Sequence, residues 1–125
     1  MAFIQMAWNA KVTLMNAVNV TSGTASDAVN LEASGYEGAA ISVLADFPGG
    51  ATDHLDVSIQ GSLDGTNFDT VALAAVRLDK ATDPGRVTFN IRNIPYFRVY
   101  AARSGSTDTI AVTVTYRPFR YRSIA

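Results

Sequence analysis

The sequence of 125 residues contains no cysteine. It therefore has no disulfide framework and no thiolate metal site, and its stability has to come from core packing and backbone hydrogen bonds. Long hydrophobic runs are also missing, since no stretch approaches the roughly 20 apolar residues that a membrane span requires. The segment from Met1 to Ala10 is apolar but lacks the basic start of a signal peptide. These absences predict a soluble protein with no cleaved signal and no membrane partner.

Residues that usually carry catalysis or hold a metal are scarce. The one histidine, His54, has no second imidazole and no thiol to complete a zinc site, and we interpret it as a loop residue beside a strand. The spacing of Asp53, Asp56, Asp64 and Asp69 lacks the closely alternating oxygen ligands of an EF-hand loop. Neither a phosphate-binding G-x-x-x-x-G-K-[ST] loop nor a G-x-S-x-G nucleophile elbow is present. We therefore expect no catalytic residues, no metal, no cofactor and no enzyme activity.

The alternation of apolar and polar residues is the strongest signal that the sequence does contain, and it is clearest over 55–73. Leu55, Val57 and Ile59 share one face, as in a half-buried strand. A turn is expected between Ser62 and Asn67, because Asp-Gly pairs are strong turn signals and asparagine tolerates positive φ. This stretch predicts a β-hairpin. Its turn residues are Asp64, Gly65 and Asn67, and its return arm begins at Phe68 and carries Val71 and Leu73.

The same alternation recurs in other short segments separated by glycine, proline and small polar residues. No amphipathic helix of convincing length is present, so we predict an all-β fold. We expect a single antiparallel two-sheet sandwich, jelly-roll-like, of about eight strands, with an immunoglobulin-type sandwich as the alternative. An amino-terminal arm or edge strand (1–10) precedes the sandwich (11–116), and a tail (117–125) follows it. The expected strands lie at 3–8, 11–20 (Val12, Leu14, Val18 and Val20 on one face), 29–33, 39–47, 86–92, 96–101 and 110–116.

The tail interleaves arginines with aromatic residues, which leaves three interpretations open. It can anchor on an adjacent subunit, which we favour, or be the frayed end of the last strand. It can also stack on bases and neutralise phosphates, but three arginines without a wider basic patch are a weak nucleic-acid footprint. Trp8 is interpreted as a cover of the core, with a subunit anchor as the alternative. The interface candidates are Trp8, Arg117, Phe119, Arg120, Tyr121 and Arg122.

Charge is spread unevenly, although the net charge is only −1. Residues 1–85 contain three cations and ten carboxylates, a sum of −7, whereas 86–125 contain seven arginines and one acid, a sum of +6. Two surfaces of opposite sign are expected if the fold keeps these segments apart. If strands from the two halves interleave, the charges average out instead.

Three segments carry a resemblance to a known class of proteins. The run VSIQGSLDGTNFDTVAL, a strand ending in IPYFRVYAA and a final strand IAVTVTY resemble small β-sandwich virion proteins of tailed bacteriophages. Those proteins decorate or cement heads, or occur as spike and fibre modules. The resemblance, over residues 40–117, implies a non-enzymatic virion component made in the bacterial host cytoplasm. It also implies a homo-oligomer, with a trimer favoured, that binds the major capsid protein or another virion protein.

The hairpin also resembles a second class, the discoidin-type carbohydrate-binding modules. Those modules have a similar strand-S-x-DG-x-aromatic pattern, in which Phe68 takes the place of a frequent tryptophan. This chain is shorter than they are and lacks their terminal cysteines. The alternative function is therefore a carbohydrate-binding module of a phage tail fibre or a secreted protein. It requires aromatic rings exposed together on one loop rim, and Tyr36, Phe68 and Tyr96 are the candidates.

Overall fold

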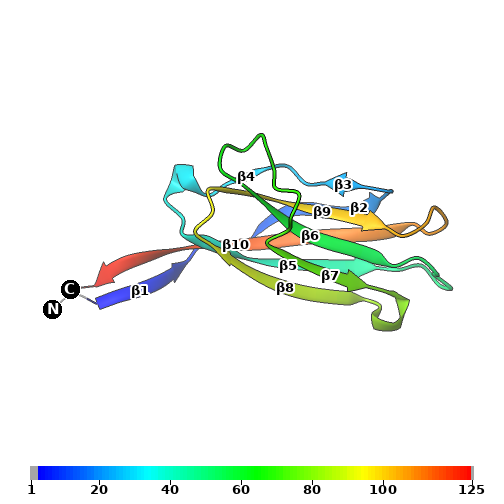
Figure 1. The fold of residues 1–125 in the computed structure, drawn as a ribbon. Coiled ribbons are helices and arrows are strands. Elements are labelled where there is room, and N and C mark those ends of the chain that lie inside the picture. Colours follow the sequence, from blue (N-terminus) through cyan, green and yellow to red (C-terminus); the bar gives the residue numbers. More distant parts are fainter. Residues whose placement is uncertain (1–2, 125) are drawn as a thin grey trace.

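Two antiparallel sheets of five strands each face one another in the computed structural model, which describes residues 3–124 (Figure 1). Short 3-10 helices, η1 (Glu32–Ser34) and η2 (Lys80–Thr82), lie in two of the connections. Sheet A consists of β1 (Phe3–Trp8), β2 (Val12–Val20), β5 (Gly38–Asp46), β8 (Gly85–Arg92) and β10 (Ile110–Ile124). Sheet B consists of β3 (Thr24–Ala25), β4 (Val29–Asn30), β6 (Leu55–Ser62), β7 (Ala74–Leu78) and β9 (Tyr96–Arg103).

The strand order within the sheets is that of a jelly roll. In sheet A, β10 lies between β2 and β5, and β8 follows β5. In sheet B, β9 lies between the short strands β3 and β4 on one side and β6 on the other, and β7 follows β6. Every pairing is antiparallel, and the chain crosses repeatedly from one sheet to the other. The predicted fold class is confirmed.

The core lies between the sheets and is built from the alternating residues that the sequence singles out. Phe97 of β9 meets Tyr116 of β10 edge-on, with ring centroids 5.6 Å apart, so aromatic packing joins the two sheets. The predicted inward faces of 39–47, 55–60, 96–101 and 110–116 are confirmed. Their fully buried residues are Ala39, Ile41, Val43, Ala45, Leu55, Val57, Ile59, Phe97, Val99, Ala101, Ile110, Val112 and Val114.

The return arm of the predicted hairpin begins later than expected. β6 ends at Ser62 and its partner β7 begins only at Ala74, so residues 63–73 form a long loop rather than a tight turn and a strand. The prediction that a strand starts at Phe68 is wrong. The reason is local, because side-chain oxygens of Ser62 and Asp64 accept hydrogen bonds from the backbone N–H groups of the loop. Those groups therefore need no strand partner.

The predicted parity of residues 11–20 fails in the middle of β2. The pairing with β10 shifts register between Val112 and Thr115, at a β-bulge. Ala17 takes a positive φ of 49°, and its N–H donates to Thr113 Oγ1 instead of a strand carbonyl. As a result Met15 enters the core, while Val12 is exposed.

The predicted strand at 29–33 is also cut short. β4 contains only Val29 and Asn30, after which the chain turns into η1. The Asn30 side-chain oxygen accepts a hydrogen bond from the Ala33 N–H, which favours this turn over continued pairing.

Candidate interaction surface

The last strand, β10, extends beyond the end of its pairing with β5. β10 pairs with β5 only as far as Phe119, opposite Gly38, and from there to Ile124 its one partner is β1. These segments, 3–8 and 119–124, form a two-stranded ribbon that projects from the sandwich (Figure 1). The chain does not break at the predicted boundary of residue 117, and the interpretation of the tail as a frayed end is wrong. Met1, Ala2 and Ala125 lie outside the described residues.

Pro118 lies inside this long strand, where proline is normally excluded because it has no N–H to donate. Its carbonyl oxygen accepts a hydrogen bond from the Asn9 N–H, at 2.8 Å. A residue of an antiparallel strand points its N–H and C=O to the same side. The backbone nitrogen of Pro118, which carries no hydrogen, therefore points toward the Asn9–Lys11 connection between β1 and β2, where no ladder hydrogen bond is needed. The ladder with β5 is kept.

One face of the ribbon is apolar. Met6 lies opposite Tyr121 and Trp8 opposite Phe119, and the Trp8 and Phe119 ring centroids are 5.1 Å apart. Trp8 remains 43% exposed and Met6 40% exposed, while Phe119 is buried. The interpretation of Trp8 as a cover of the sandwich core is therefore wrong. Exposed apolar side chains grouped on one face mark a candidate interaction site.

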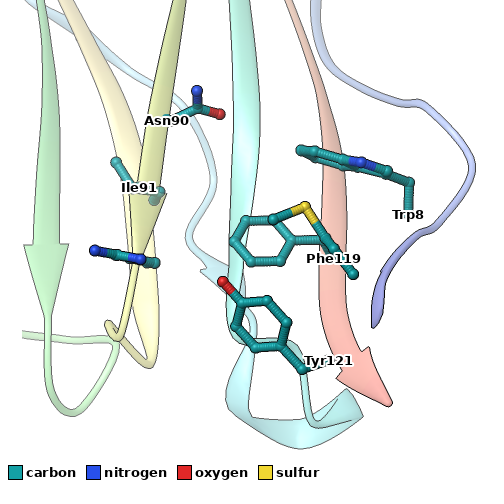
Figure 2. A pocket seen from close by; sticks show the side chains of 7 residues that line it. Trp8, Asn90, Ile91, Phe119 and Tyr121 are labelled. Atoms are coloured by element: carbon teal, nitrogen blue, oxygen red, sulfur yellow. The ribbon is translucent and has the colours of Figure 1, made fainter. Parts of the chain in front are cut away.

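A hollow of about 260 Å³ opens beside these rings. Figure 2 shows Trp8, Phe119 and Tyr121 grouped on the ribbon side, with Asn90 and Ile91 of β8 across from them. Met6 and Arg92 complete the lining, which includes no carboxylate. The hollow is thus an apolar depression with one cation at its wall.

The five predicted interface residues of the tail, three arginines and two aromatic residues, divide between two faces. Arg117 lies on the Trp8 side, with its guanidinium 5.9 Å from the indole and its Nε donating to the Asn9 carbonyl. On the opposite face, Arg120 stacks over Tyr36 and Arg122 donates to the Gln5 side chain. Arg117 therefore shares the side of Trp8 and Phe119, whereas Arg120 and Arg122 lie on the opposite face.

Charges of the two sequence halves interleave in part. β10 of the basic half lies between strands of the acidic half in sheet A, and β9 lies beside β6 in sheet B. Even so, Arg86, Arg92 and Arg117 all lie on the outer side of sheet A, because they alternate with the inward residues of β8 and β10. No ion pair within residues 3–124 engages any of these three arginines. The outer side of sheet A is consequently basic beside the hollow.

A second exposed apolar patch lies on the loop of residues 63–73. Leu63 is 80% exposed and Val71 is 81% exposed. The loop contains two acids, Asp64 and Asp69, and no basic residue. In its first turn Gly65 adopts a φ of 77°, and Asp64 accepts hydrogen bonds from the N–H groups of Thr66 and Asn67. The loop is thus acidic, exposes apolar side chains, and begins with a turn formed by Asp64, Gly65 and Asn67.

Three of the four aspartates whose spacing was compared with a calcium loop, Asp53, Asp56 and Asp64, are engaged in structural contacts. Asp53 and Asp108 are buried and clasp two loops, because each carboxylate accepts hydrogen bonds from the other residue's backbone N–H. Asp56 pairs with Arg77, and this contact, more than the nearby His54, lowers the pKa of its carboxyl. Within residues 3–124, no group of three potential metal ligands lies together.

The aromatic candidates for sugar binding are partly covered. The Arg98 guanidinium lies 4.3 Å from the Phe68 ring centroid. Gly65 packs on Tyr96 so closely that an added Cβ would come within 2.8 Å of the ring. Tyr36 is half-buried beneath Arg120 and bonded to the Asn9 amide. The three rings do not offer a shared open platform.

The sequence interpretation missed part of the apolar face. Ile4 and Met6 alternate with Gln5 and Ala7, so their shared face with Trp8 could have been predicted from the period of two. Gly38 and Arg92 could not, because only the pairing of β10 with β5 and of β5 with β8 brings them to the hollow.

The class of protein that these features define is a jelly-roll sandwich with an apolar ribbon. No helix of residues 3–124 is long and apolar enough to cross a bilayer. No family model matches the sequence, and no curated protein matches it significantly.

Proposed function

We propose that this chain is a non-enzymatic structural protein of a bacteriophage virion, most specifically a capsid decoration or cement protein. It stabilises the head through contacts among its own copies, with a trimer favoured, and through contacts with the major capsid protein. The resemblance to small phage sandwich proteins motivates the assignment. The observation that carries it is the projecting ribbon.

The ribbon supports an assembly role because of what it exposes. Ile4 is 77% exposed and lies beside Met6 and Trp8 on one face, so this face exposes three large apolar side chains together, as interaction sites commonly do. Aromatic side chains, methionine and arginine are the residues enriched at protein interfaces. Jelly rolls also occur as the building units of viral capsids. A rigid sandwich that carries such an arm is suited to holding neighbouring subunits together.

Particle composition tests the proposal. Virions of the phage that encodes the sequence would be purified on a density gradient and quantified by mass spectrometry. We expect the chain in the particles at a fixed ratio to the major capsid protein. Its absence from purified particles would refute the virion assignment, and retention by immobilised glycans would favour the carbohydrate-binding alternative.

A matched pair of variants links the result to the ribbon. Met6→Asp places a charge on the apolar face, whereas Gln5→Asp places the same charge on the opposite face of the same strand. We expect Met6→Asp to reduce incorporation into particles by at least about tenfold. Gln5→Asp should be incorporated like the wild type, and equal incorporation of both variants would count against the ribbon as the attachment element.

A further inference from the structure

We infer that the apolar hollow at the base of the ribbon receives the loop of residues 63–73 from a second copy of the same chain. This inference rests on the proposed assembly function and specifies its partner and its contact surfaces. The contact is head-to-tail, because the hollow and the loop are different surfaces of one molecule. A head-to-tail contact that closes on itself produces a ring, such as the favoured trimer.

The shapes of the two surfaces are complementary. The hollow of about 260 Å³ is lined by Met6, Trp8, Phe119 and Tyr121. For comparison, an apolar cavity of about 150 Å³ accommodates benzene. Leu63 and Val71 project from the loop and are the two most exposed large apolar side chains of residues 4–122. Insertion of such a side chain would remove apolar area from water on both surfaces.

The charges of the two surfaces are complementary as well. Arg92 lines the hollow, Arg117 lies beside Trp8, and the lining of the hollow includes no carboxylate. The loop brings Asp64 and Asp69. Arg98 adjoins the loop, but its guanidinium is already held over Phe68 and by the Gln60 side chain. The loop is therefore the acidic partner and the hollow the basic one.

The same charges argue against pairing of one ribbon with another ribbon. A symmetric contact between two apolar ribbon faces would place Arg92 and Arg117 of both copies in one interface, where like charges repel. The acidic loop removes this conflict. Charge complementarity thus favours a contact in which the second copy contributes its loop of residues 63–73.

Complementation between two defective variants tests the contact. Met6→Asp damages the hollow, and Val71→Asp damages the loop at a side chain that is 81% exposed. Because Val71 makes little contact in its own copy, its substitution should leave the fold intact, as checked by thermal melting. Thr70→Asp, one residue away, is the matched control for added charge. Self-association would be measured by sedimentation equilibrium.

We expect each damaging variant alone to associate at least about tenfold more weakly than the wild type, and Thr70→Asp to associate normally. An equimolar mixture of the two damaging variants should form 1:1 pairs. The Val71→Asp copy supplies an intact hollow and the Met6→Asp copy an intact loop. Assembly should stop at two copies, because the remaining surfaces of the pair are both damaged.

Three results would overturn the inference. They are wild-type association of Val71→Asp, a mixture that stays monomeric, and a wild-type protein that is itself monomeric at micromolar concentration. None of them bears on the particle assay, which would still detect a virion protein held by the capsid alone. Conversely, a chain that is absent from particles but passes the complementation test would refute the virion assignment and retain this contact.

Discussion

Gly38 is the residue on which the base of the ribbon depends. It lies opposite Phe119 in β5, and an added Cβ would come within 2.8 Å of the Phe119 ring and would overlap the Ile91 carbonyl oxygen. The absence of a side chain therefore lets the ring lie over β5 and form one wall of the hollow. A glycine in a strand often marks such a close approach.

We predict that Gly38→Ala destabilises the protein by about 1–3 kcal/mol, because the ring and the β8 backbone both have to move. Denaturant unfolding would measure the loss, and Trp8 fluorescence would report the displaced ring. Gly49→Ala is the control, since nothing lies within 4 Å of its added Cβ and its φ is not positive. A Gly38→Ala protein as stable as this control would contradict the packing.

Among the elements, the loop of residues 63–73 has a stability that depends on pH. Hydrogen bonds from the backbone N–H groups of Asn67 and Thr66 hold the pKa of the Asp64 carboxyl well below its usual range. A carboxyl with a lowered folded-state pKa stabilises the fold fully above its unfolded pKa of about 3.9 and loses this contribution as pH falls toward the folded value.

We therefore predict that Asp64→Ala is less stable than the wild type at pH 7 and that the difference shrinks steadily below about pH 4. The measurement is the free energy of unfolding from pH 7 to pH 2. Asp69→Ala is the control, because the Asp69 side chain makes no hydrogen bond within residues 3–124. A constant difference between the Asp64 variant and the wild type would show that the carboxylate does not hold the loop.

These elements also show what the sequence can predict. Alternation located β5, β6, β9 and the first half of β10, because a buried face imposes a period of two on the residues that form it. It failed where side-chain oxygens accept hydrogen bonds from backbone N–H groups in place of ladder carbonyls, as with Asp64 in the loop and with Thr113, which accepts from Ala17 in the bulge. The hollow could not be predicted from the sequence, because a single sequence does not show which strands become neighbours.

At the scale of the whole molecule, stability rests on the closure of the two sheets over one core. Ile59 is fully buried in β6, between Val99 of β9 and Ala74 of β7 in the ladder, and it faces sheet A. Ser58, its neighbour in the chain, points to the outside of sheet B. These two adjacent positions face opposite sides of sheet B, so the same substitution at each of them tests the layered arrangement.

We predict that Ile59→Asp unfolds the domain. A buried carboxylate without a partner costs several kcal/mol in addition to the lost packing, and a domain of this size has only about 5–15 kcal/mol in total. Ser58→Asp should shift the melting temperature by no more than a few degrees, because its carboxylate stays in water. Circular dichroism melts of both variants measure the difference. A cooperative Ile59→Asp melt near the wild-type temperature would mean that this face of β6 does not close the core.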